Sequence, residues 1–472
     1  MRSAPGRVTE TCSGTRGCEE VIAEREPERV ADIDLNGWCQ ALRELTPLRR
    51  TGRVTQVIGL TLEAEGLAAR VGEICYLSSS GPKARTVAEV VGFRGNRLLL
   101  MPLGELPAIR PGSQVTASGR VFTVPAGEEL LGRVLDGLGR PVDGKGPLYA
   151  SHRCFISNDP PHPLNRTRIQ EPLCTGVRAI DGLLTVGKGQ RIGIFAGSGV
   201  GKSTLLGAIA RAHGSEMDVS VIGLIGERGR EVREFIERDL GPEGLARSVV
   251  VVSTSDQPAL VRLKGAWVAT ALAEHFRDQG RDVTLLMDSV TRFAMAQREV
   301  GLAIGEPPAA KGYTPSVFAL LPRLMERAGT SDRGTITAFY TVLMEADDLT
   351  EPITDTVRSV LDGHIVLSRQ LAAKNHYPAI DVLGSVSRVM NQVTDAEHQA
   401  AAGELREVLA TYDSARDLVE IGAYAAGSNP RIDRALRLLP RVNEFLRQRP
   451  DEPWPYAETV SWLKRMFTED AK

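Results

Sequence analysis

The sequence predicts an α/β core that lies between a small N-terminal β-barrel and a C-terminal helical region. Three observations support this order. Short β-rich runs separated by glycines fill residues 53–122, which is typical of a small barrel. From about residue 165, apolar strand patterns alternate with amphipathic helix patterns. After about residue 395 the strand patterns stop and helical patterns remain.

Length and composition are typical of a soluble globular protein with two or three domains. A formal net charge of −2 gives no general attraction to polyanions, so no nucleic-acid partner is expected. No run of about 18 apolar residues predicts a membrane span, and residues 1–30 lack the apolar core of a signal peptide. We therefore expect a cytoplasmic protein whose six scattered cysteines are reduced thiols.

Residues 1–50 are expected to form a mobile segment that contains one short amphipathic helix. The first part is polar, and Leu35, Trp38, Leu42 and Leu45 then recur at helical spacing. This apolar stripe could pack on the next domain or could be presented to a partner protein. The spacing leaves both alternatives open.

Three further domains are predicted along the rest of the chain. Residues 51–125 form the barrel, and the stretch 132–148, rich in Gly, Pro and Asp, predicts a connector of tight turns. Residues 126–391 form the α/β domain, whose continuous apolar runs indicate parallel strands buried on both faces. Residues 392–472 form the C-terminal helical domain.

The stretch IFAGSGVGKSTLL at 194–206 predicts a phosphate-binding loop between a strand and a helix. Its glycines let the backbone amides turn inward at a helix N-terminus, which forms an anion nest. Lys202 would reach the β- and γ-phosphates, and Ser203 would bind Mg²⁺. Ala196 stands where the general pattern has its first glycine, a difference of one methyl group. The predicted nucleotide contacts are Gly197, Ser198, Gly199, Val200, Gly201, Lys202, Ser203 and Thr204.

Two carboxylates complete the predicted site. Asp288 follows an apolar strand pattern and would help Ser203 to hold Mg²⁺, although an Asp at a strand end is often only a cap. Glu227 follows another strand and would orient the attacking water, or would pair with nearby arginines on a solvated helix start. Arg292 could reach the phosphates or form a structural salt bridge.

Several stretches together resemble the hexameric ATPases related to the catalytic subunits of rotary F-type and V-type ATPases. They are GSGVGKST, IGERGREVREF, LLMDSVTRFAMAQREV and YPAIDVLGSVSRVMN, in that order. Within this superfamily the chain is most similar to the ATPases of type III protein export, and to their flagellum-specific branch in particular. The stretches that indicate this are GEPPAAKGYTPSVFALLPRLMERAG, EADDLTEPITDTVRSVLDGHIVLSR and IGAYAAGSNPRID.

The resemblance implies a RecA-like P-loop core and a role for each matching residue. Glu227 would be the carboxylate that polarises the attacking water. Arg228 and Arg292 would contact or sense the γ-phosphate. Tyr377 and Tyr424 would line the adenine pocket.

Arg388, in GSVSRVM, matches the arginine finger that reaches into the site of a neighbouring subunit. Because one chain carries both Glu227 and Arg388, a homohexamer could hold a complete site at every interface. The resemblance further implies ATP with Mg²⁺ as substrate and a place at the cytoplasmic face of the inner-membrane export apparatus. Hydrolysis would help to release export substrates from chaperones. The implied partners are a stator-like regulator at the N-terminus, a stalk protein in the ring centre, chaperone–substrate complexes and the export gate.

Alternative functions stay open at this point. A virulence-secretion ATPase shares the same motifs. A rotary ATP synthase subunit is disfavoured because base and finger share this chain and the acidic DELSEED stretch is missing. An RNA-translocating hexamer would need more basic and aromatic residues on the barrel, where Tyr76, Phe93 and Phe122 are the only aromatics. A non-catalytic ring member is disfavoured by the intact phosphate loop and carboxylates.

Overall fold

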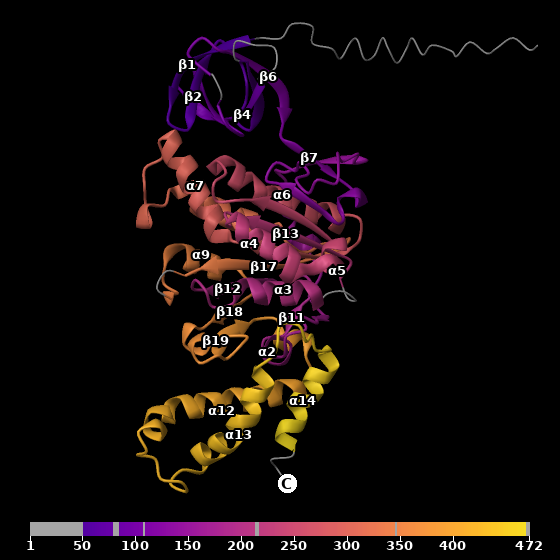
Figure 1. Ribbon diagram of the computed structural model, residues 1–472, viewed down its shortest axis with the longest axis vertical. Helices are drawn as coiled ribbons and strands as arrows, with labels where there is room; N and C mark the ends of the chain where they lie inside the picture. Colours follow the sequence, from indigo (N-terminus) through magenta and orange to yellow (C-terminus); the bar gives the residue numbers. More distant parts are fainter. Residues whose placement is uncertain (1–50, 79–84, 107–108, 213–216, 345–346, 469–472) are drawn as a thin grey trace, which may run out of the picture. The chain divides into compact units, whose positions relative to one another are not determined.

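The computed structural model describes residues 51–78, 85–106, 109–212, 217–344 and 347–468, all within one compact unit, Arg50–Lys472 (Figure 1). The predicted stripe of Leu35, Trp38, Leu42 and Leu45 lies outside the described residues. In the part of the chain that the structure describes, no helix combines the length and apolar character that a membrane span requires.

The β-rich runs form a closed barrel, as predicted. In the described part of residues 51–121, six strands follow one another around it in the order β1-β2-β5-β4-β3-β6. Leu62, Leu77, Leu100 and Val115 are fully buried inside it. The strands are β1 (Thr51–Ile58), β2 (Thr61–Glu65), β3 (Glu73–Ser78), β4 (Arg85–Arg94), β5 (Arg97–Pro102) and β6 (Gln114–Val121). Lys264 and Glu89 form an ion pair of 2.6 Å that joins the barrel to the α/β part.

Nine strands of the described residues form the central sheet, in the order β19-β18-β12-β17-β15-β13-β14-β8, with β16 paired to β17. Neighbours from β18 to β8 are parallel, which confirms the predicted α/β fold, whereas β19 runs antiparallel to β18. The strands are β8 (Arg133–Asp136), β12 (Arg191–Ala196), β13 (Val219–Ile225), β14 (Ser248–Ser253), β15 (Asp282–Asp288), β16 (Gly329–Thr330), β17 (Thr335–Leu343), β18 (Gly363–Leu367) and β19 (Ile380–Ser387).

One part of this sheet differs from the sequence prediction. The stretch 132–148 is not only a connector, because β8 lies within it and pairs with β14 at the edge of the sheet. Val134 and Leu135 are opposite Val250 and Val251 in that pairing. Four residues are too few for a periodic pattern to stand out among the surrounding glycines.

A hydrophobic core lies on each face of the sheet in the described part of the chain. Successive strand residues point to opposite faces, so Leu285 of β15 belongs to one core and Leu286 to the other. This arrangement explains why the strands are apolar throughout. The main helices on the two faces, drawn in Figure 1, are α3 (Lys202–Ala212), α6 (Ala259–Arg277), α7 (Val290–Ile304), α8 (Pro315–Met325) and α9 (Pro352–Val360).

Shorter elements connect these layers. The strands β7 (Thr123–Ala126) and β9 (His152–Phe155) pair with each other, as do β10 (Pro172–Leu173) and β11 (Val186–Gly187). The short helices are α2 (Arg178–Leu183), α4 (Gly229–Glu234), α5 (Gly241–Ala246), α10 (Arg369–Ala373) and α11 (Met390–Val393), and a π-helical turn covers Phe235–Leu240.

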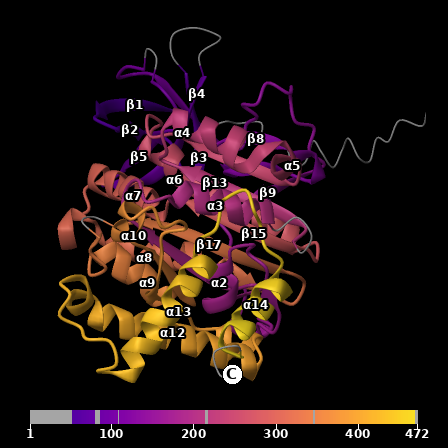
Figure 2. The same ribbon diagram turned by 60° about the horizontal axis from the view of Figure 1, so that its bottom comes forward.

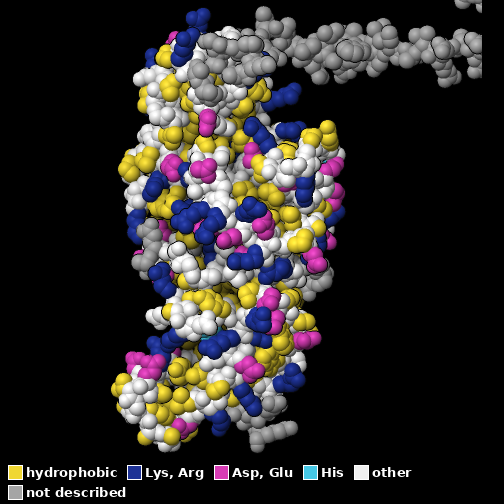
Figure 3. Space-filling model, in the orientation of Figure 1, with side chains coloured by type: hydrophobic (Ala, Val, Ile, Leu, Met, Phe, Trp, Pro, Cys, Tyr) yellow, Lys and Arg dark blue, Asp and Glu magenta, His cyan; other side chains and the backbone are white. Residues whose placement is uncertain are grey.

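The C-terminal residues are helical, as predicted. The helices α12 (Ala396–Glu420) and α13 (Pro430–Leu446) form a hairpin, and α14 (Tyr456–Thr468) packs on α2 and α12 (Figures 1 and 2). Asp395 caps α12 by accepting a hydrogen bond of 2.7 Å from the His398 amide. On the face drawn in Figure 3, Lys and Arg side chains lie interspersed with Asp and Glu, in keeping with the net charge of −2.

Candidate nucleotide site

The predicted phosphate loop, residues 197–201, connects strand β12 to helix α3. Gly199 and Gly201 have φ angles of +79° and +93°, which residues with a side chain rarely adopt. A Cβ atom at Gly197 would lie 2.6 Å from Asp347 Oδ1 and 2.7 Å from Arg369 Nη2, so this position is also crowded. The loop therefore requires its glycines for turning and for close approach, and it ends at the first turn of α3.

Lys202, the first residue of α3, lies between two carboxylates. Its Nζ atom is 2.5 Å from Asp288 Oδ1 and 3.3 Å from Glu227 Oε1. Asp288 ends β15 and Glu227 follows β13, so the parallel strands bring both carboxylates to the same edge of the sheet. Thr341 of the adjacent strand β17 donates a hydrogen bond of 2.7 Å to Asp288 Oδ1. The structure thus brings together three of the predicted site residues from three elements.

Burial and charge set the protonation of this cluster. Burial raises the pKa of Glu227 to about 7, and the negative charge of Asp288 adds to the shift, while Lys202 opposes it. Burial would lower the pKa of Lys202, but the carboxylates of Asp288 and Glu227 outweigh it, and the pKa is raised. Lys202 is therefore charged at neutral pH, and Glu227 can gain or lose a proton near pH 7.

The two predicted γ-phosphate arginines differ in their surroundings. Arg228 is 76% exposed and pairs with Glu231 at 3.2 Å, at the start of α4. Arg292, in the first turn of α7, packs against the backbone of Gly226, one residue before Glu227. Its Nε atom is buried and has no hydrogen-bond partner among the described residues. Arg292 thus lies next to the carboxylate cluster with an unused donor.

A cavity of about 210 Å³ lies beside the phosphate loop and is lined mostly by apolar atoms. Its lining includes Val200, Gly201, Thr204, Tyr377 and the segment 448–450. The ring of Tyr377 lies 3.6 Å from the place where a Cβ of Gly201 would be. The cavity therefore has a flat aromatic wall directly next to the phosphate loop, as an adenine pocket requires.

Tyr424 is not part of this cavity lining, so its expected place in the adenine pocket stays a prediction. It lies in the loop between α12 and α13, where its hydroxyl is 3.0 Å from both Asp433 Oδ1 and the Asn429 carbonyl oxygen. The segment after α13 lines the cavity instead, because the chain returns to the phosphate loop at residues 448–450. The Gln448 amide donates a hydrogen bond of 2.9 Å to the Tyr377 carbonyl. No motif in the sequence marks residues 448–450.

Arg388 lies at the amino-terminal end of the parallel strands, whereas the phosphate loop lies at their carboxyl-terminal end. It follows β19, and the antiparallel pairing places Ser387 opposite Gly363 at the start of β18. These two ends of the strands are about 20 Å apart, which is the length of the six residues of β12, the strand next to β18. The Arg388 side chain is exposed and has no ion-pair partner among the residues that the structure describes. Arg388 therefore cannot reach Lys202 of its own chain.

Comparison with known proteins identifies the family. The nucleotide-binding domain of the ATP synthase alpha/beta family matches residues 176–387, and the beta-barrel domain of that family matches residues 54–119. The T3SS EscN ATPase C-terminal domain matches residues 394–465. The flagellum-specific ATP synthase of Bacillus subtilis is 55% identical over 416 residues, covering 88% of this chain and 94% of that protein. The chain belongs to the type III export ATPases.

Other members of the type III export ATPases agree with this assignment. The type 3 secretion system ATPase of Xanthomonas euvesicatoria is 52% identical over 91% of this chain and 97% of its own length. The assembled ATPase EscN of enteropathogenic E. coli has a TM-score of 0.83 and 46% identity, covering 88% of this chain and 99% of EscN. EscN in complex with its central stalk EscO has a TM-score of 0.81 and 45% identity, with the same coverage. This chain is accordingly an ATP-hydrolysing enzyme of type III protein export.

Proposed function

We propose that this type III export ATPase serves the flagellum, and that it hydrolyses MgATP at sites formed between identical subunits of a hexameric ring. The observation that carries the proposal is the separation of Arg388 from Lys202, Glu227 and Asp288 within one chain. An arginine finger at the opposite end of the strands can complete a nucleotide site only when it belongs to a second subunit.

In this mechanism, the amides of the phosphate loop and Lys202 hold the phosphates. Lys202 would exchange its present carboxylate contacts for phosphate oxygens. Glu227 orients the water for in-line attack on the γ-phosphate, and Arg292 offers its unused Nε–H to a γ-phosphate oxygen. Arg228 directly follows Glu227 in the sequence and is therefore close enough to contact the γ-phosphate as well. Arg388 of the neighbouring subunit stabilises the charge of the transition state.

The residues present fit a magnesium ion carried by the nucleotide. Mg²⁺ prefers oxygen ligands and usually takes one or two from the protein, with the rest from phosphates and water. Ser203, in the first turn of α3, and Asp288, at the end of β15, supply such oxygens. In the described part of the chain, no cluster of three or more acidic, His or Cys side chains forms a separate metal cage. The ion would neutralise charge on the phosphates, while Ser203 and Asp288 hold it in register with the loop.

Tyr377 and the segment 448–450 form the proposed adenine pocket beside the phosphate loop. The proposed assembly includes a central stalk protein, in the role that EscO has in its complex with EscN. A stator-like regulator at residues 1–50, chaperone–substrate complexes and the export gate are the other proposed partners. The proposed location is the cytoplasmic face of the inner membrane.

A mixing experiment tests the shared site. Lys202→Ala removes the phosphate contact, Arg388→Ala removes the finger, and each homogeneous ring should be inactive. In an equimolar mixture of both chains, about a quarter of the interfaces pair an intact loop with an intact finger, so ATPase activity should reappear. Mixed rings that form but stay inactive would contradict the proposal.

The flagellar assignment rests on the quoted sequence stretches and on the 55% identical flagellum-specific relative. Virulence secretion is the second candidate, favoured by the 52% identical relative from Xanthomonas euvesicatoria. The chain should restore swimming to a Bacillus subtilis strain that lacks its own flagellum-specific ATP synthase. Rescue of secretion in a Xanthomonas strain that lacks its type 3 secretion system ATPase, without rescue of swimming, would favour the second candidate.

A further inference from the structure

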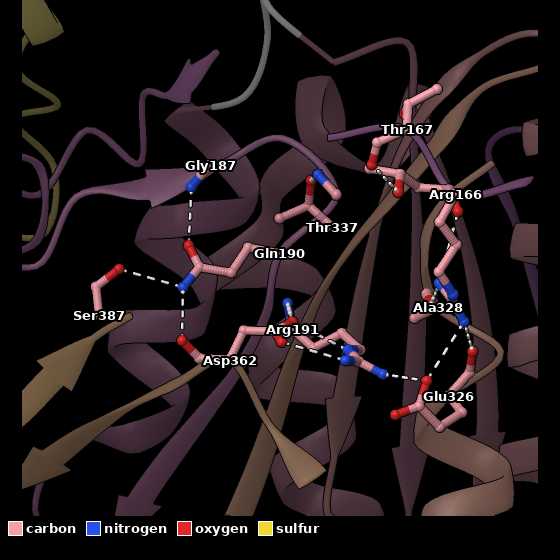
Figure 4. Close-up of polar contacts among 12 residues, drawn as sticks. Arg166, Thr167, Gly187, Gln190, Arg191, Glu326, Ala328, Thr337, Asp362 and Ser387 are labelled. Atoms are coloured by element: carbon pink, nitrogen blue, oxygen red, sulfur yellow. Dashed lines mark hydrogen bonds and ion pairs between the residues drawn. The ribbon is translucent and has the colours of Figure 1, made fainter. Parts of the chain in front are cut away.

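The backbone at Arg388 is bonded to Asp362, which in turn contacts the start of the strand that carries the phosphate loop. The Arg388 amide donates a hydrogen bond of 3.0 Å to the carbonyl oxygen of Asp362, in the residue before β18. The same carbonyl accepts a second hydrogen bond of 3.1 Å from Gln190 Nε2. Gln190 directly precedes β12, so this strand has Gln190 at one end and the phosphate loop at the other. Figure 4 shows the Gln190 side chain bonded to Gly187, Asp362 and Ser387.

The Gln190 side chain is fully buried, and its polar atoms are all used near Arg388. Besides Asp362, its Nε2 donates to Ser387 Oγ at 3.1 Å, and its Oε1 accepts from the Gly187 amide at 2.9 Å. Ser387 Oγ donates in turn to the Thr185 carbonyl at 2.8 Å. A buried amide stabilises a fold only when its hydrogen bonds are made. This one fixes the Asp362 carbonyl, to which the Arg388 amide is bonded, and the side chain of Ser387, the residue before Arg388.

A second layer of charges holds Asp362 itself. Arg191 Nε and Nη2 donate to the two Asp362 carboxylate oxygens at 3.0 and 3.1 Å, and Arg191 Nη1 lies 2.6 Å from Glu326 Oε2 (Figure 4). Bidentate arginine–carboxylate pairs fix orientation as well as distance. The Asp362 carbonyl oxygen accepts hydrogen bonds from Gln190 and from the Arg388 amide, and the carboxylate of the same residue is fixed by Arg191. Asp362 is therefore held in place from two sides.

We propose that Gln190, together with Ser387 and the Asp362 carbonyl, positions Arg388 for the active site of the neighbouring subunit. This inference rests on the proposed function, in which Arg388 is the finger. Because the Arg388 side chain is exposed without an ion-pair partner in the described residues, its own subunit can fix only its backbone. A displacement of about 1 Å at a catalytic group can lower a rate about 100-fold, so the position of this backbone matters.

Two substitutions test the proposal in the assembled ring. Ser387→Ala removes the hydroxyl that Gln190 contacts, and Gln190→Met keeps the side-chain length but removes the amide. Each should lower kcat about tenfold or more, while KM for ATP and nucleotide affinity stay within about twofold. Ser387→Thr keeps the hydroxyl and should restore most of kcat. Unchanged kcat in both Ser387→Ala and Gln190→Met would overturn the proposal.

Ser385→Ala is the matched control on the same strand. Ser385 is buried and its hydroxyl bridges two backbone groups, donating to the Asp381 carbonyl at 2.5 Å and accepting from the Val366 amide at 2.9 Å. It makes no hydrogen bond to Gln190, so its loss should leave kcat within about twofold. An equal loss of kcat in Ser385→Ala and Ser387→Ala would show a general effect of weakening β19 and would overturn the positioning role.

A double substitution separates this inference from the proposed function. If Gln190 acts only through Arg388, Gln190→Met should not lower kcat further in an Arg388→Ala background, as single-turnover hydrolysis can measure. Additive losses would overturn the inference. Wild-type kcat in Arg388→Ala would instead refute the finger and with it the proposed function. If Gln190→Met prevents ring assembly, Ser387→Ala in the same background gives the same comparison.

Discussion

At the residue scale, the site is a set of charges arranged around Lys202. One ammonium group faces two carboxylates, so the cluster is neutral when Glu227 is protonated and negative when Glu227 is ionised. The phosphates of ATP add more negative charge in a buried place, where charges interact strongly. In the proposed mechanism, binding would therefore depend on positive groups, namely Lys202, Arg292 and the metal that Ser203 and Asp288 would hold.

The pH dependence of catalysis should follow Glu227. Burial, assisted by Asp288, raises the pKa of this carboxyl to about 7, and the group orients water only when it is ionised. The value of kcat/KM, which reports the free enzyme, should therefore rise between about pH 6 and about pH 8. The rising limb should disappear in Glu227→Gln. A limb that persists there would belong to another group.

Glu227→Gln should also separate binding from hydrolysis. The amide keeps the shape of the side chain but cannot act as a base, so kcat should fall about 100-fold or more while ATP still binds. Hydrolysis and the binding of a fluorescent nucleotide measure the two effects. Glu234→Gln is the control, because Glu234 lies exposed at the end of α4, the helix that begins two residues after Glu227, and among the described residues it pairs with Arg230 at 3.8 Å. Equal losses in both variants would contradict the role of Glu227.

Tyr377→Ala should weaken nucleotide binding more than catalysis. Stacking of a base on an aromatic ring contributes about 1–3 kcal/mol, so KM for ATP should rise at least about fivefold. Tyr424→Ala should leave KM unchanged, because Tyr424 is not part of the cavity beside the phosphate loop. An increase of KM in Tyr424→Ala alone would indicate that Tyr424 lines the adenine pocket, as the resemblance implied.

At the element scale, strand direction decides which residues meet. Parallel strands place Glu227 and Asp288 at the edge that carries the phosphate loop. The antiparallel strand β19 instead delivers Arg388 to the opposite edge, next to Asp362. One reversal of direction at the end of the sheet therefore places Arg388 at the opposite end of the strands from Glu227 and Asp288, as the proposed site between subunits requires.

A buried ion pair joins Glu274 of α6 to Arg327, which lies just after α8. Its loss should lower the stability of the fold. Arg327 Nε and Nη2 lie 2.7 and 2.5 Å from the Glu274 carboxylate, and the two side chains are 0% and 3% exposed. Arg327→Met leaves this carboxylate buried and unpaired, and should lower the free energy of unfolding by about 3–5 kcal/mol in urea titrations. Arg327→Met combined with Glu274→Leu should cost less. A larger cost in the double variant would contradict this account.

At the scale of the whole molecule, assembly should control activity. If each site needs Arg388 from a second subunit, the ATPase rate per chain should rise steeply with protein concentration until rings are complete. Arg388→Ala should remove this rise and lower the saturated rate about 1,000-fold or more. Rates and ring mass can be measured on the same samples. A rate per chain that is flat and insensitive to Arg388→Ala would mean that each chain works alone.

Much of this protein could be predicted from its sequence, because the decisive patterns are local. Strand and helix periodicity, and the glycines at 197, 199 and 201, act within a few residues. They correctly predicted the barrel, the parallel sheet, the C-terminal helices and the glycine-rich turn between a strand and a helix at residues 197–201. The short strand β8 was missed because four residues carry too little pattern.

The tertiary structure decided what depends on contacts between distant segments. Glu227 and Asp288 meet Lys202 only because β13, β15 and β12 end at the same edge of the sheet. Residues 448–450 line the cavity beside the phosphate loop because the chain returns there after α13. Gln190 reaches Ser387 only through the pairing of β18 with β19, across 197 positions of sequence. Local patterns cannot specify such pairings, because strand order and direction are settled by packing of the whole sheet.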